Sequence, residues 1–149
     1  MDTLVISQGR LLLVGLTCTL IIGGCELFVI GTPAKRRPPI ERSQRSSAGV
    51  VHVFKAEIDS GNTTAATELM VNSTGRPLLA VEKYELADDL VRWRSVMAGV
   101  PISDTEIDTV SEGVHDVTIT LDYIRKMRFG TLRKDNQWWI TKITDLKRR

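Results

Sequence analysis

Residues 117–123 read VTITLDY, and this stretch decides the fold class. Its apolar side chains alternate with threonine and aspartate, which is the period of a strand that buries one face. Two further strands are expected at 127–133 and 138–143, joined by the polar turn KDNQ at 134–137, and residues 105–110 are a weaker candidate for a leading strand. The C-terminal part of the chain therefore predicts an antiparallel meander of three or four strands.

The residues before these strands show helical spacing instead. A first helix is expected to begin at one of the serines at 46–47, which can cap its N-terminus, and to end near Gly61. Asn62 or Thr63 can cap a short second helix that runs through about Met70. The apolar residues of the first helix share one face: Val50, Val51, Phe54 and Ile58.

A third helix is predicted to have Pro77 in its first turn, where the missing N–H is harmless, and to stop at Gly99 and Pro101. It carries the clearest apolar stripe of the chain: Leu86, Leu90, Trp93 and Met97. Trp93 lies in the middle of this stripe, so we expect it to pack against the sheet. The order of the elements predicts an α+β fold, with three N-terminal helices on a three- or four-stranded antiparallel meander sheet.

An apolar segment, residues 11–31, precedes the predicted helices and contains Glu26 as its only charge. Arg10 comes before the segment, and residues 22–25, IGGC, follow its most apolar part. This arrangement resembles the signal peptide and lipobox of bacterial lipoproteins. The resemblance implies that Cys25 is acylated, with palmitate among its fatty acids, and becomes the mature N-terminus.

Two other interpretations of residues 1–31 stay open. About twenty apolar residues can span a bilayer, so the segment could be an uncleaved helix that anchors an exported domain. The cluster Lys35, Arg36 and Arg37 outnumbers Arg10, however, and the positive-inside rule then favours a single-pass protein with a cytoplasmic domain. All three interpretations predict attachment to a membrane, and the lipoprotein interpretation places the domain in the bacterial cell envelope.

Residues 32–47 contain three prolines and five basic residues but one acid, which predicts a linker before the domain at 48–149. The domain itself has fourteen Lys and Arg against fifteen Asp and Glu, a net charge of −1. A nearly neutral domain gives no support for nucleic-acid binding. Both cysteines, Cys18 and Cys25, lie in the apolar segment, and the chain has two histidines, so we expect no disulfide, metal or cofactor in the domain.

Two motifs carry a family resemblance. Residues 50–70, VVHVFKAEIDSGNTTAATELM, resemble the first two helices of small bacterial lipoproteins with a nuclear-transport-factor-2-like (cystatin-like) domain. Residues 133–143, RKDNQWWITKI, resemble their closing hairpin, with Asn136 where glycine is more usual. The resemblance implies a curled sheet wrapped by helices into a cone, but no reaction, because this fold hosts unrelated functions.

The strongest candidate for a partner surface lies on the last two strands. Trp and Arg dominate binding hot spots, and regular strands would point the two adjacent tryptophans to opposite sides. One tryptophan is therefore expected in the core and the other at least partly exposed. The candidate surface residues are Arg128, Arg133, Trp138 and Trp139.

An acid–base pair inside the cone is a weaker hypothesis. Its candidate groups are Tyr84, His115, Asp116, Asp122 and Tyr123. His115 and Asp116 are adjacent on a strand and should face opposite sides, whereas Tyr123 continues the apolar alternation and is expected to point inward.

The leading hypothesis is a membrane-tethered, non-enzymatic envelope lipoprotein whose domain binds a protein partner or a small ligand, with a homodimer as an open alternative. The second is a bitopic inner-membrane scaffold subunit, because type IV secretion scaffold proteins resemble this layout of one N-terminal helix and one such domain. The third is a small isomerase-like or cyclase-like enzyme.

Overall fold

The computed structural model describes residues 39–146, which belong to the compact unit Pro39–Arg149. The predicted signal or anchor segment at 1–31, with Cys25, lies outside the described residues, as do residues 32–38 of the predicted linker. Within 39–146, no helix combines the length and the apolar character needed to cross a membrane.

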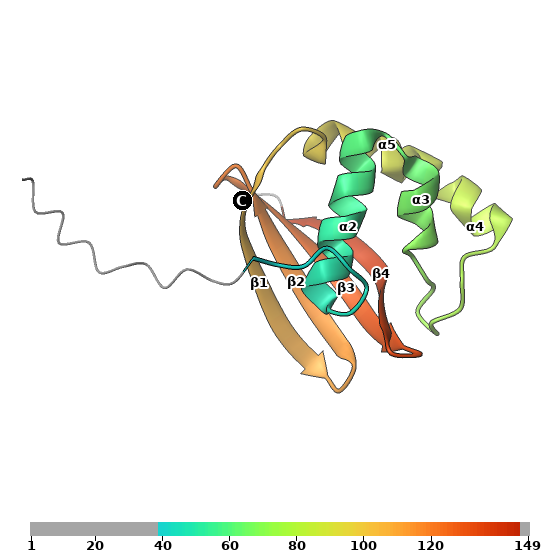
Figure 1. Cartoon of the computed structure of the whole chain (residues 1–149). Coiled ribbons are helices and arrows are strands. Elements are labelled where there is room, and N and C mark those ends of the chain that lie inside the picture. The colour runs from blue at the N-terminus through green and yellow to red at the C-terminus, as the bar shows by residue number, and fades with distance from the viewer. Residues whose placement is uncertain (1–38, 147–149) are drawn as a thin grey trace, which may run out of the picture. The chain divides into compact units, whose positions relative to one another are not determined.

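The described residues form an α+β fold with four helices and four strands. In chain order the elements are α2 (Ser47–Ser60), α3 (Thr63–Glu68), α4 (Ala80–Glu85), α5 (Ala87–Met97), β1 (Ile102–Ser111), β2 (Val114–Leu121), β3 (Arg125–Lys134) and β4 (Gln137–Leu146). The strands form one antiparallel sheet in the order β1-β2-β3-β4, with α2 lying across one face (Figure 1). This is the predicted meander, and residues 105–110 are part of the full-length strand β1.

The predicted caps of the first two helices are confirmed. Ser46 Oγ accepts a hydrogen bond from Gly49 N at 3.0 Å, and Asn62 Oδ1 accepts one from Ala65 N at 3.2 Å. Gly61 ends α2 with a φ of 78°, in the left-handed region that favours glycine. Local side-chain chemistry therefore sets both boundaries.

The prediction of one long third helix is wrong at its start and in its middle. Pro77 pairs with Val71 in an isolated antiparallel bridge, so the helix begins only at Ala80. Leu86 then separates α4 from α5, being the C-cap of one and the N-cap of the other. The rest of the stripe is buried as expected, with Trp93 5% exposed.

Aromatic rings join the helices to the sheet. The ring of Phe54 on α2 lies edge-on to Trp93 of α5 at 6.2 Å and to Phe129 of β3 at 5.9 Å between centroids. Such edge-to-face pairs add to the burial of apolar area. The strands supply the other wall of the core: Val117, Ile119, Leu121, Met127, Phe129, Trp138 and Ile140.

Both tight turns of the last three strands use left-handed residues. Asp135 and Asn136 have φ values of 50° and 62°, which confirms the turn that Asn136 was expected to tolerate. Asp122 and Tyr123 have φ values of 45° and 59°, because Ile124 N donates to Leu121 O and closes a turn directly after β2. The alternation therefore ends at Leu121, and Tyr123 is 85% exposed, contrary to the prediction that it points inward.

The outer edge of β4 is paired by segments from earlier in the chain. Trp138 N donates to Gln44 O at 2.8 Å, and Gln44 Nε2 donates to Trp138 O at 3.2 Å. Further along, Ile140 N donates to Leu69 O, and Val71 N donates to Ile140 O. The last residues of the predicted linker are therefore part of the folded unit.

Candidate functional site

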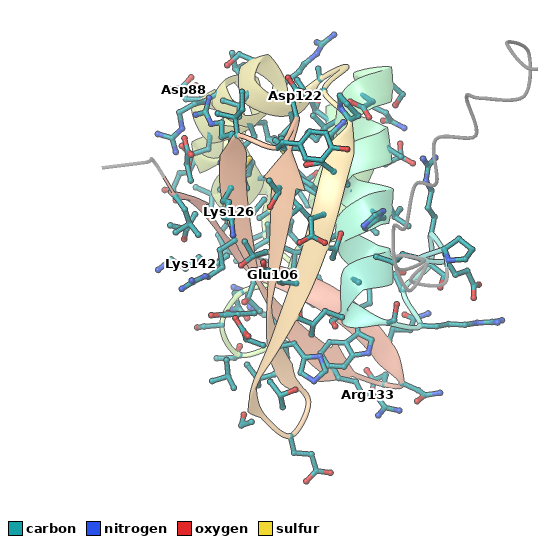
Figure 2. All side chains as sticks on the ribbon, turned by 90° about the vertical axis from the view of Figure 1, so that its left-hand side faces the viewer. Asp88, Glu106, Asp122, Lys126, Arg133 and Lys142 are labelled. Atoms are coloured by element: carbon teal, nitrogen blue, oxygen red, sulfur yellow. The ribbon has the colours of Figure 1, made fainter. Side chains whose placement is uncertain are left out.

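The face of the sheet opposite α2 holds the candidate site and is called the open face below. Strand register brings Glu106 of β1, Thr118 of β2, Arg128 of β3 and Thr144 of β4 into one row across it. Its charged residues are Asp104, Glu106, Asp108, Asp116, Lys126, Arg128, Lys134 and Lys142. Figure 2 shows Lys126 and Lys142 on the side of the sheet away from α2.

Charge is divided between the two halves of the open face. All of its acidic residues lie on β1 and β2, and all of its basic residues lie on β3 and β4. An ion pair joins the halves, because Lys126 Nζ reaches across β2 to Glu106 Oε1 at 3.6 Å. The open face is therefore an acidic strip beside a basic strip.

Threonines form the floor between the two strips. Thr118 and Thr120 are 4% and 8% exposed, although the helices pack on the other face of the sheet (Figure 1). Long charged side chains can shield neighbouring surface with their stems while the charged ends stay in water. The charged residues of the open face therefore flank a row of β-branched threonines on β2.

Two basic residues of the open face are not neutralised by an acidic side chain of the described residues. Arg128 and Lys142 are exposed, and no acidic partner reaches either of them within residues 39–146. Gly130 lies two residues after Arg128 on β3 and pairs with Asp116 of β2 and Lys142 of β4. Because it is a glycine, no side chain projects from the sheet at this position. This part of the open face can accept an acidic group from outside the domain.

The structure divides the four residues of the predicted partner surface. Arg128 and Trp139 belong to the open face, and Trp139 is partly exposed opposite Leu132. Arg133 pairs with Trp138 on the helix side, near the β3–β4 turn at the lower end of the sheet in Figure 2. Strand alternation therefore splits the tandem tryptophans, with one in the core and one partly exposed, as predicted.

Trp138 is closed off by its neighbours. Its ring lies 4.3 Å from that of His115 between centroids, and His115 Nδ1 is 2.9 Å from Ser47 Oγ at the start of α2. Trp138 itself is 7% exposed. This tryptophan stabilises the lower end of the core and presents little area to a partner.

The groups named for an acid–base pair do not converge. Tyr84 and Tyr123 are 82% and 85% exposed, on α4 and on the β2–β3 turn. His115 faces Trp138, whereas Asp116 faces the Gly130 gap on the open face, so these neighbours do point to opposite sides. In the described part of the chain, no group of three or more His, Cys, Asp and Glu side chains is placed to hold a metal ion.

The edge strand β1 bears on self-association. Antiparallel pairing of two β1 edges centred on Glu106 would set Glu106 against Glu106 and Asp104 of each copy against Asp108 of the other. Like charges opposite each other on paired strands are destabilising, and charged side chains are a common protection for exposed edges. The acidic strip therefore disfavours a homodimer built through this edge.

A scan of the chain against protein-family models finds no match, and a search of curated proteins finds no significant relative. The function must therefore be inferred from the geometry of the open face and from the N-terminal sequence.

Proposed function

We propose that this protein is a membrane-tethered, non-enzymatic binding protein whose open face docks on a protein partner. One observation carries the proposal: the open face has a fixed division of charge in which Arg128 and Lys142 have no acidic partner in the described part of the chain. Trp139 extends the basic strip with partly exposed aromatic surface.

The division of charge defines the partner's chemistry. A complementary surface has acidic groups opposite Arg128 and Lys142 and basic groups opposite Asp108 and Asp116. Such complementarity fixes orientation and raises the association rate more than it raises affinity. Arg128 and Trp139 are the residue types that most often dominate binding energy, and both extend from a rigid sheet.

The sequence supplies the proposed location. The IGGC motif with Cys25 supports lipid attachment in the bacterial envelope, and the basic residues at 32–47 suit a tether near anionic headgroups. The finer fold proposal, a cystatin-like cone, has the support of the helix order and the four-stranded meander. Palmitate labelling should be lost in Cys25→Ala; an unlabelled native chain that stays in the membrane would favour the helix-anchored alternatives.

The proposal is tested by cross-linking in cells with a photoreactive residue in place of Thr144, which lies opposite Arg128. We expect a defined adduct that disappears in the double variant Arg128→Glu, Trp139→Ala and persists in Arg128→Lys. Arg92→Glu is the matched control, because Arg92 is exposed on α5 and belongs to the helical layer. An adduct that survives the double variant, or that Arg92→Glu removes equally, contradicts docking on the open face.

A further inference from the structure

A separate cleft lies between α2 and the start of β1. Its volume is about 370 Å³, at the small end of the range for ligand pockets. Among its lining residues are Arg42, His52, Lys55, Asp59, Val100 and Pro101. None of these residues belongs to the open face.

The floor of the cleft is a fixed polar arrangement on α2. Lys55 is 5% exposed, and its Nζ donates to both carboxylate oxygens of Asp59 at 2.6 Å. Asp59 Oδ1 also accepts from Gly99 N at 2.9 Å, which ties the loop before β1 to the helix. The charge of Lys55 is thus neutralised within the fold, as a buried cation requires.

Arg42 provides the remaining positive charge. It is exposed at the cleft, and no acidic side chain of the described residues pairs with it. His52 lies deeper, with Nε2 3.1 Å from Thr105 Oγ1 of β1. Burial and the nearby Arg42 both lower the pKa of His52, so the imidazole is neutral at pH 7.

We propose that this cleft binds a small carboxylate with an apolar body. The Arg42 guanidinium pairs with the carboxylate, because its planar fork of donors matches two carboxylate oxygens. The apolar body lies against Val100 and Pro101 of the loop and Ala56 of α2. This site is independent of the open face, so neither proposal requires the other.

A carboxylate bound at Arg42 should change the pKa of His52. Among the described residues, the charged groups that line the cleft with His52 are Arg42 from the segment before α2 and Lys55 and Asp59 from α2. The hydrogen-bond partner of His52 on β1 is the uncharged Thr105. A carboxylate beside Arg42 offsets the positive potential that opposes protonation of His52. Ligand binding should therefore raise the pKa of His52.

The test uses the full-length chain, labelled with ¹⁵N-histidine, in nanodiscs of uncharged lipid. The chain has two histidines, so His115, which packs against Trp138 outside the cleft, is an internal reference. Benzoate should shift the His52 ring signals with a Kd on the order of 1 mM, as for a small ligand held by one charged contact, and should raise the pKa of His52. The His115 signals should stay in place.

Two controls decide the outcome. Benzamide has the same shape without the charge, and it should produce no saturable shift. Arg42→Gln should raise the pKa of His52 without ligand and abolish the response to benzoate, while unchanged His115 signals report an intact fold. Equal shifts with benzamide, or an undiminished benzoate response in Arg42→Gln, would overturn the proposal, as would the absence of any benzoate response in the native chain.

Discussion

On β2, Thr118 and Ile119 are neighbours in the chain but meet different environments. Ile119 is fully buried in the core that Phe54 and Trp93 complete, whereas Thr118 lies on the opposite face of the sheet, outside that core. The same alternation holds on β3, where Phe129 is buried and Arg128 is exposed.

The helix side of the sheet supplies stability, whereas the open face carries the residues proposed for recognition. Burial of apolar area on the helix side supplies most of the free energy of folding. Exposed charges contribute little to stability because water solvates and screens them, so they can vary to suit a partner. Substitutions on the two faces should therefore have effects of different size on unfolding.

The largest effect is expected on the helix layer that covers the sheet. Trp93→Ala should lower the free energy of unfolding by about 3–5 kcal/mol, because it removes a buried aromatic ring that contacts Phe54. Urea unfolding would measure the loss. Val91→Ala on the same helix is the control, since Val91 is 69% exposed and should change the free energy by about 0.5 kcal/mol or less. A loss below about 1 kcal/mol for Trp93→Ala would mean that the ring contributes little to the core.

The adjacent pair on β2 gives the most direct comparison of the two faces. Ile119→Ala should lower the free energy of unfolding by about 2–5 kcal/mol through a cavity in the core. Thr118→Ala should lower it by about 1 kcal/mol or less, in the range of β-propensity and cross-strand contacts. Equal losses, measured by urea unfolding under the same conditions, would show that the open face is packed as tightly as the core.

A smaller effect, dependent on pH, is expected at the rim of the core. The pKa of His52 lies below its ordinary value of 6.5, so the unfolded chain binds more protons than the folded chain as the pH falls below 6.5. The free energy of unfolding should therefore rise with pH between the lowered pKa of the folded chain and 6.5. Above pH 6.5 the contribution of His52 should be complete. His52→Gln should flatten that rise in thermal unfolding, and an unchanged slope would show that other groups cause it.

The smallest effect is expected for the ion pair on the open face. Glu106→Gln removes the partner of Lys126, but both side chains are about half exposed. Water and salt screen such pairs, so the free energy of unfolding should fall by about 0.5 kcal/mol or less. A double-mutant cycle with Lys126→Gln would isolate the coupling, and a coupling above about 1 kcal/mol would make the bridge across β2 structural.

Sequence reasoning succeeded where the decisive chemistry was local. The caps at Ser46, Gly61 and Asn62 and the left-handed turn at Asn136 depend on residues within a few positions of one another. The alternation in β2 likewise fixed its buried face, and the stripe around Trp93 identified the covering helix.

The predictions of helix and strand boundaries failed where tertiary contacts override the conformational preference of the local sequence. Pro77 is used in a bridge to Val71, and no residue near Leu86 is a strong helix breaker, so the division of the third helix has no local signal. At Tyr123 the alternation continues in the sequence after the strand has ended.

The candidate sites were only partly visible from the sequence. The separation of Arg128 from Arg133 follows from counting alternate residues along β3, a signal that was available. His52, Lys55 and Asp59 lie at helical spacing on one flank of α2, which could have marked that flank as polar. The approach of Arg42 and of the loop at 99–101 to this flank required the folded chain.

Tension on the chain before α2 acts on the hydrogen bonds at Gln44. There the chain is fastened to the backbone of Trp138 by hydrogen bonds in both directions, 94 residues away in sequence. A pull on the tether loads these bonds and the start of α2 before any pair of neighbouring strands. If the domain is tethered to a membrane, we expect this junction to separate first under load and to lengthen the tether by several residues, while the paired strands of the open face stay together.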